Sequence, residues 1–158
     1  MKLTSSAFNN NGFMPSRYTC DGQNISPPLT VSEVPEDARS LVLIMDDPDI
    51  PDFVKEKYGI QIWDHWIVFN IASTIKEISE GQNPAGILGK NTRGSNAYSG
   101  PCPPDAEHRY FFKLLALDSK LNLPAGSSKT QIEEAMNGHI IEKAELVGRY
   151  NRIKPVIK

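Results

Sequence analysis

The sequence predicts a mainly β protein, a sandwich of antiparallel or mixed sheets with one or two short helices near the C-terminus. Apolar runs of strand length recur through the first 117 residues, and turn-forming Gly, Pro and Asn separate them. Convincing helical periodicity occurs once, after residue 128. This order of elements is typical of a sandwich, and 158 residues fit a single domain spanning 1–158.

Five segments have strand character. In chain order they are Leu29–Val31, Leu41–Asp47, Ile60–Ile71, His108–Leu117 and a short stretch at about 144–150. Leu41–Asp47 is apolar on both faces, which predicts a central strand. In the third segment, strict alternation places His65 on the face of Trp63 and opposite Trp66, so we expect Trp66 to lie in the core.

One helix is predicted late in the chain, from about residue 129 to 141. Thr130 and Glu133 have the spacing of a capping box, and an apolar stripe recurs at intervals of four from residue 132 to residue 140. His139 falls within this segment, so we expect it to pack or to contact a strand. A basic tail broken by Pro155 follows the last strand.

Two segments between the strands are predicted to be loops. Asp52–Gly59 is polar and charged, which favours an exposed loop. Lys76–Pro104 holds many of the glycines and ends in Gly-Pro-Cys-Pro-Pro. Because a long aperiodic segment between patterned strands is more often functional than a linker, we expect this loop to contribute to a site.

Charge and hydropathy exclude several partners. The formal net charge is −2 and no basic run occurs, which argues against a nucleic acid or an anionic membrane surface. The chain starts with polar residues and has no apolar stretch long enough to cross a bilayer, so we expect no membrane insertion and a cytoplasmic location. We therefore expect Cys20 and Cys102 to be reduced thiols, unless the fold brings them together.

Ionisable side chains gather at the ends of the predicted strands. Asp47 and Asp49 follow one strand, His65 lies near the start of another, and His108 and Tyr110 open a third. Polar groups at strand ends can converge in a pocket at one end of a sandwich. Each also has a structural interpretation, because buried histidines are usually hydrogen-bonded core residues and Asp-Pro often marks only a turn.

These residue types suit an anion. A carboxylate beside an imidazole raises the pKa of the imidazole, so Asp47 can hold His65 and His108 in their charged forms near neutral pH. The Tyr110 hydroxyl and backbone amides around Gly100 add donors. Trp63 supplies an apolar wall.

An enzyme is the alternative. Two aspartates and two histidines can hold a divalent metal whose bound water attacks an ester, which makes a metal-assisted hydrolase the rival hypothesis. The chain lacks a compact ligand motif such as H-E-x-x-H, and no serine or cysteine has an evident base. We therefore expect no catalytic residue, no metal and no cofactor.

Four motifs resemble a known family. They are D-P-D-I-P from Asp47, W-D-H-W from Trp63, G-P-C-P-P from Gly100 and H-R-Y from His108. In this order and spacing they are similar to the phosphatidylethanolamine-binding proteins, also called Raf kinase inhibitor-like proteins. The likeness covers nearly the whole chain and is strongest to the prokaryotic branch.

The resemblance implies a β-sandwich with a pocket that accepts phosphate, acetate or a phosphorylated headgroup. The residues it places in that site are Asp47, Asp49, Trp63, His65, Gly100, Pro101, Cys102, Pro103, His108 and Tyr110. The Pro-rich loop is shorter before His108 than in animal members, and no C-terminal helix follows the last strand. Anion binding therefore carries over better than lipid binding or kinase inhibition.

The function expected from sequence is that of a non-enzymatic binding or regulatory protein. Its ligand would be a phosphorylated or anionic small molecule, or a phospho-group on a protein such as a kinase or a protease. By resemblance to the prokaryotic branch, we also expect a homodimer.

Overall fold

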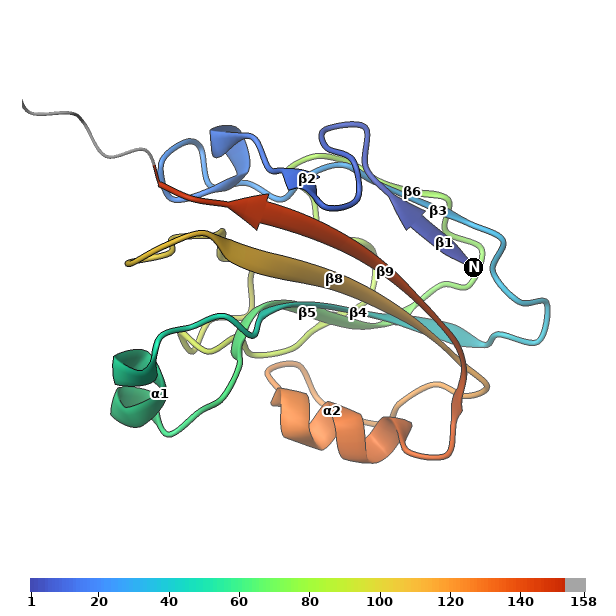
Figure 1. Ribbon diagram of the computed structural model, residues 1–158. Coiled ribbons are helices and arrows are strands. Elements are labelled where there is room, and N and C mark those ends of the chain that lie inside the picture. The colour runs from blue at the N-terminus through green and yellow to red at the C-terminus, as the bar shows by residue number, and fades with distance from the viewer. Residues whose placement is uncertain (153–158) are drawn as a thin grey trace, which may run out of the picture.

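The computed structural model describes residues 1–152 and is mainly β, as predicted (Figure 1). Its strands are β1 Lys2–Thr4, β2 Gly12–Phe13, β3 Leu29–Ser32, β4 Ser40–Asp47, β5 Trp63–Ile71, β6 Glu77–Ile78, β7 Ile87–Leu88, β8 His108–Leu117 and β9 Ile140–Tyr150. Its helices are α1 Asp52–Tyr58, α2 Lys129–Met136 and a short 3-10 turn, η1, Ser16–Tyr18. The basic tail with Pro155 lies outside the described residues.

The strands form two sheets. The larger has the order β2-β9-β8-β4-β5-β7 and is antiparallel except for the β2–β9 pair, while the smaller has the order β1-β3-β6. β4 lies between β8 and β5, and all eight of its residues are buried, as its apolar faces predict. The sheet is therefore mixed, with the longest strands at its centre.

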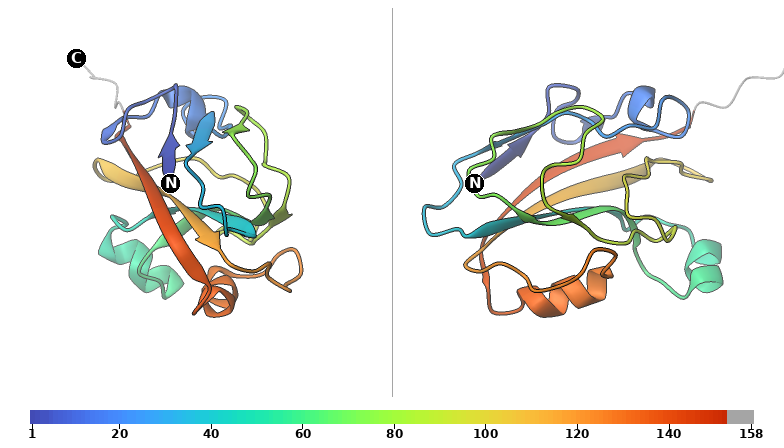
Figure 2. Two further views of the ribbon diagram at one scale, coloured as in Figure 1. Left: turned by 90° about the vertical axis from the view of Figure 1, so that its right-hand side faces the viewer. Right: turned by 180° about the vertical axis from the view of Figure 1, so that it is seen from behind.

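Each face of the large sheet is covered by a different layer (Figures 1 and 2). On one face, side chains of the small sheet such as Leu3 and Val31 pack with Leu43 and Phe112 to form the main core. On the opposite face α2 buries Ile132 and Met136 against Ile44 and Phe69. Tyr110 belongs to the main-core face, whereas Asp64 of the W-D-H-W motif lies on the α2 face, where it pairs with Lys129.

A β-bulge in β5 places His65 and Trp66 on the same face of the sheet. Met45 pairs with Trp66 and Asp46 pairs with Asp64, so His65 is an extra residue opposite this step of β4. Trp66 is fully buried in the main core, as expected, and His65 is turned toward the same side. The strict alternation predicted for this strand is wrong at this point.

The segment 52–59, predicted to be an exposed loop, contains helix α1 instead. The helix begins after Pro51, whose fixed φ suits a helix start, and ends at Gly59, which adopts a left-handed φ of 65°. No residue of α1 is buried, so the apolar periodicity that identifies a helix in sequence is absent. This helix also lies mid-chain and not near the C-terminus.

Helix α2 is shorter than predicted and begins with a different cap. Ser128 is the N-cap, and its capping box partner is Gln131. The helix ends at Met136, and Gly138 follows with a positive φ of 81°. His139 therefore lies outside the helix, where its exposed ring is 2.7 Å from Asp118, and Ile140 already belongs to β9.

Across the part of the chain that the structure describes, no helix is long and apolar enough to span a membrane.

Candidate functional site

A cavity of about 100 Å³ opens where β4 ends and where β5 and β8 begin. These strands are antiparallel neighbours in the order β8-β4-β5, so the end of β4 lies at the same edge of the sheet as the starts of the other two. The residues that line the cavity are Asp47, Ile50, Pro51, Val54, Trp63, His65, Arg93, Gly100, Cys102, Pro103, Pro104, His108 and Tyr110. Sequence-predicted site residues from three strands and the Pro-rich loop are thus brought together.

His108 is an imidazolium held between two carboxylates. Its Nδ1 is 2.7 Å from Asp47 Oδ2 and its Nε2 is 2.7 Å from Asp105 Oδ1, so both nitrogens donate and the ring carries a charge. Burial opposes that charge, but Asp47 and then Asp105 outweigh it, and the pKa of His108 is raised above 6.5.

The two carboxylates differ in exposure. The side chain of Asp47 is only 4% exposed, whereas that of Asp105 is 41% exposed. The other carboxylate oxygen of Asp47, Oδ1, accepts a hydrogen bond from the backbone amide of Asp49 at 2.7 Å, which further fixes this side chain. Asp47 is therefore a buried and fixed partner of His108, whereas Asp105 is exposed to solvent.

His65 is neutral, which differs from the expectation that Asp47 charges both imidazoles. Burial lowers the pKa of His65 below 6.5, and the Ser99 carbonyl and the charge of Asp47 offset only part of that effect. Its Nδ1 lies 2.5 Å from the Ser99 carbonyl, which accepts, so Nδ1 carries the proton. In the neutral ring the other nitrogen, Nε2, is then a hydrogen-bond acceptor.

Two further polar groups at the cavity have no recorded protein partner among residues 1–152. The Tyr110 ring is buried next to both imidazoles, with its centroid 5.3 Å from that of His65 and 6.4 Å from that of His108, and its hydroxyl makes no hydrogen bond to residues 1–152. Burial raises the pKa of this hydroxyl, so it stays protonated and remains a donor. The Trp63 indole likewise donates to no described residue, and Tyr58 packs edge-on against it at 5.1 Å.

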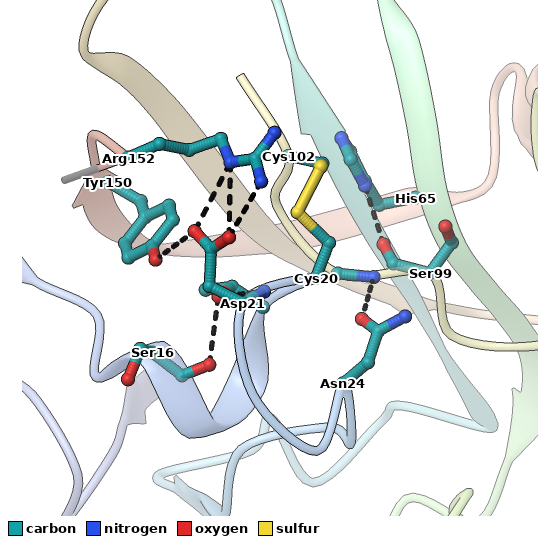
Figure 3. Close-up of a disulfide and its surroundings, with 11 residues drawn as sticks. Ser16, Cys20, Asp21, Asn24, His65, Ser99, Cys102, Tyr150 and Arg152 are labelled. Carbon is teal, nitrogen blue, oxygen red and sulfur yellow. Dashed lines mark hydrogen bonds and ion pairs between the residues drawn. A yellow bond between two sulfur atoms is a disulfide. The ribbon is translucent and has the colours of Figure 1, made fainter. Parts of the chain in front are cut away.

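The Pro-rich loop is tied to the segment after η1, and the expectation of two reduced thiols is wrong. Cys20 and Cys102 form a disulfide, with Cα atoms 5.4 Å apart and a separation of 82 positions in sequence (Figure 3). The amide of Cys20 donates to the Pro101 carbonyl at 3.1 Å, and the Gly100 amide donates to Asn24 Oδ1 at 2.8 Å. The fold thus supplies the proximity that spacing in sequence does not reveal.

Two residues that the resemblance placed in the site do not line the cavity. Asp49 accepts hydrogen bonds from the backbone amide, Nε and Nη2 of Arg109 at 2.8–2.9 Å, and this clamp joins the end of β4 to β8. Arg109 lowers the pKa of Asp49, although partial burial opposes the shift. Pro101 belongs to the Pro-rich loop but is buried, and its carbonyl accepts a hydrogen bond from the Cys20 amide.

Sequence reasoning missed Arg93 and Asp105. Arg93 stands at the tip of a tight turn in which the Asn91 side chain accepts from the Ser95 amide and donates to the Ala97 carbonyl. Within residues 1–152 no ion pair of Arg93 is recorded, so its charge is free at the cavity. Asp105 lies three residues before His108 and directly after Pro104, and that spacing is the only sequence signal for its contact.

The other cation cluster near the sheet is already neutralised. A larger groove of about 780 Å³ lies between α2 and strands β8 and β9. There Lys113 and Lys129 each donate to Asp46 Oδ2 at 3.0 Å, and Lys129 also donates to Asp64 at 3.0 Å. These contacts fasten α2 to the sheet and leave neither lysine free for a ligand.

Among the described residues, no group of three or more His, Cys, Asp or Glu side chains is arranged to hold a metal ion.

Comparison with known proteins identifies the family. The family model for phosphatidylethanolamine-binding protein matches residues 4–151. The chain belongs to the phosphatidylethanolamine-binding protein family. Membership supports a non-enzymatic binding protein as its general class.

Two similar relatives are prokaryotic, in agreement with the likeness of the sequence motifs to the prokaryotic branch. A UPF0098 protein of Chlamydia trachomatis is 47% identical over 152 residues, with 96% of this chain and 99% of the relative covered. A UPF0098 protein of Methanothermobacter thermautotrophicus is 48% identical over 158 residues, again with 96% of this chain and 99% of the relative covered.

Two solved structures support the same assignment. The crystal structure of a putative phosphatidylethanolamine-binding protein homologue from Chlamydia trachomatis superposes with a TM-score of 0.91 at 47% identity, covering 96% of this chain and 97% of the other. E. coli YbcL, described as a new member of the mammalian family, has a TM-score of 0.84 at 29% identity, covering 96% and 98%.

Proposed function

We propose that this family member binds a phosphate-bearing or similar anionic group in the cavity between β4, β5 and β8. The observation that carries the proposal is the set of unsatisfied groups there. The Tyr110 hydroxyl, the Trp63 indole and His65 Nε2 belong to residues that line the cavity, are not among the buried unpartnered atoms, and have no hydrogen-bond partner among residues 1–152. A ligand with several oxygens would satisfy them together.

The chemistry of these groups favours phosphate over other anions. Tyr110 and Trp63 donate, so they suit oxygens with lone pairs, while neutral His65 Nε2 accepts and suits an oxygen that carries a proton. A monoprotonated phosphate offers both kinds of oxygen, whereas sulfate at neutral pH offers only acceptors. Arg93 adds a positive charge that attracts either anion.

The size of the cavity limits what enters it. About 100 Å³ corresponds to roughly three water molecules at ~30 Å³ each, which is room for a phosphate group but for little of the molecule that carries it. We therefore propose that the rest of the ligand stays outside, as it would for a phosphorylated small molecule or a phospho-group on a protein. The kinase or protease partner expected from sequence belongs to this second case, and inhibition assays with purified enzymes test it.

Removal of one hydroxyl tests the proposal directly. Tyr110→Phe deletes a donor that has no protein partner, so the unfolding temperature should be unchanged while affinity for inorganic phosphate, measured by calorimetric titration, falls about three- to tenfold. Tyr58→Phe is the matched control, because its exposed hydroxyl lies on α1 outside the cavity. Equal phosphate affinity in wild type and Tyr110→Phe would remove this cavity as the binding site.

A further inference from the structure

The imidazolium of His108 at the cavity is already paired with carboxylates of the chain itself. His108 has two N–H donors, and Asp47 takes the inner one while Asp105 takes the outer one, both at 2.7 Å. The His108 side chain is only 2% exposed, so these two carboxylates are the immediate neighbours of its charge. An incoming anion therefore finds no free N–H on the imidazolium.

Asp105 is held far less firmly than Asp47. It lies in the segment Pro103–Glu107, which contains no helix or strand. Within residues 1–152, no backbone hydrogen bond from this segment to another part of the chain is recorded, and Pro103 and Pro104 have no amide hydrogen to donate. The Asp105 carboxylate is 41% exposed, and a solvent-exposed partner contributes little to an ion pair.

The anchors of the loop stop just before this segment. The disulfide holds Cys102, and the hydrogen bonds from Cys20 and to Asn24 hold Pro101 and Gly100. On the other side β8 begins at His108. Pro103 and Pro104 line the cavity, but Asp105, Ala106 and Glu107 do not, so these last three residues can move without disturbing the cavity wall or the sheet.

We propose that Asp105 is an internal anion that occupies the ligand's place on His108 Nε2, and that a phosphate-class ligand binds by displacing it. This inference rests on the proposed function and assigns Asp105 as a specificity-determining residue. Asp105 acts as a tethered competitor at high effective concentration. A monocarboxylate such as acetate exchanges the Asp105 carboxylate for another carboxylate and therefore gains no binding free energy. Phosphate takes the same place on His108 and also hydrogen-bonds Tyr110 and His65.

Asp105→Ala tests the displacement. Calorimetric titration with inorganic phosphate should show affinity three- to fivefold higher than wild type, because the competitor is gone. Acetate should bind the variant and not the wild type. Glu107→Ala is the matched control: it removes the same charge from the same segment, but Glu107 pairs with Arg149 and not with His108, so its affinities should equal those of wild type.

The histidine ring supplies a second readout. In ligand-free Asp105→Ala the pKa of His108, followed by NMR, should fall below its wild-type value, and saturating phosphate should restore it, because phosphate takes the vacated position. Asp105→Asn provides a second variant of nearly unchanged size in case the alanine variant folds poorly.

The outcomes separate this inference from the proposed function. Phosphate binding that is weakened in Tyr110→Phe, and is equal to wild type or weaker in Asp105→Ala, would overturn the role of Asp105 and leave the phosphate site standing. No phosphate binding by wild type or by either Asp105 variant would overturn the proposed function itself. Equal increases in phosphate affinity in Asp105→Ala and Glu107→Ala would show that the effect comes from the loss of any negative charge in this segment. That result would also overturn the inference.

Discussion

Removal of the disulfide should cost this protein a large part of its stability. The double variant Cys20→Ser/Cys102→Ser opens a closed loop whose ends are 82 residues apart in sequence. The chain-entropy relation for a loop of this length gives about 4.5 kcal/mol, and measured effects of disulfides are typically about 2–4 kcal/mol. For a chain of this size about 1 kcal/mol shifts the unfolding temperature by roughly 2–4 °C, so we expect a fall of about 10 °C.

The loop should nevertheless stay in place in the folded variant. Three hydrogen bonds still join it to η1 and the segment that follows: Cys20 amide to Pro101 carbonyl at 3.1 Å, Gly100 amide to Asn24 at 2.8 Å and Tyr98 hydroxyl to Tyr18 carbonyl at 2.7 Å. The backbone donor at position 20 survives the substitution to serine. The variant should therefore unfold earlier but cooperatively, with a native far-UV spectrum below the transition.

Thermal unfolding followed by circular dichroism, with and without dithiothreitol, provides the measurement and its internal control. The reductant should lower the transition of wild type toward that of the double variant and should not affect the variant. A variant that unfolds within about 2 °C of oxidised wild type would refute the argument, because the crosslink would then not restrict the unfolded chain.

Three further effects follow from single side chains. Ser128→Ala removes the N-cap of α2 and should lower the free energy of unfolding, measured with urea, by about 1 kcal/mol. An unchanged free energy of unfolding would show that the capping box does not stabilise the protein. Gly148→Ala places a Cβ 2.5 Å from Met14 Cγ and 3.0 Å from Phe8 Cε2, so we expect a loss of about 1–3 kcal/mol in the same assay. Because the folded pKa of His108 is raised, its stabilisation is complete below pH 6.5 and is lost as pH rises through the folded pKa. The stability difference between wild type and His108→Gln should therefore be larger at pH 5.5 than at pH 8.5.

The sequence predicts the parts of this fold that depend on regular burial. β4 is buried on both faces, so its continuous apolar run identifies a central strand, and β8 begins and ends where its pattern does. Helix α1 buries none of its residues, so it leaves no apolar stripe to recognise. Helix existence was predictable for α2, but its boundaries depended on which hydroxyl caps it.

The site is predictable to the extent that strand ends determine it. Asp47, His108 and Tyr110 follow from strand alternation and antiparallel pairing, because they lie at one edge and on one face of the sheet. His65 shares the face of Trp63, as alternation predicts, but a β-bulge turns Trp66 to that face as well, which strict alternation does not include. The pairing of Cys20 with Cys102 depends on how two distant loops meet, and no local pattern encodes it.

NMR titration of the histidine rings tests the central claim, that a charged His108 lies at an anion site. The chain has only three histidines, and His139 provides an exposed reference in the same spectrum. In the free protein the pKa of His108 should lie above 6.5 and that of His65 below it. Added inorganic phosphate should raise the pKa of His108 further without moving that of His139. An unchanged His108 pKa at saturating phosphate, or equal shifts at His108 and His139, would contradict the account.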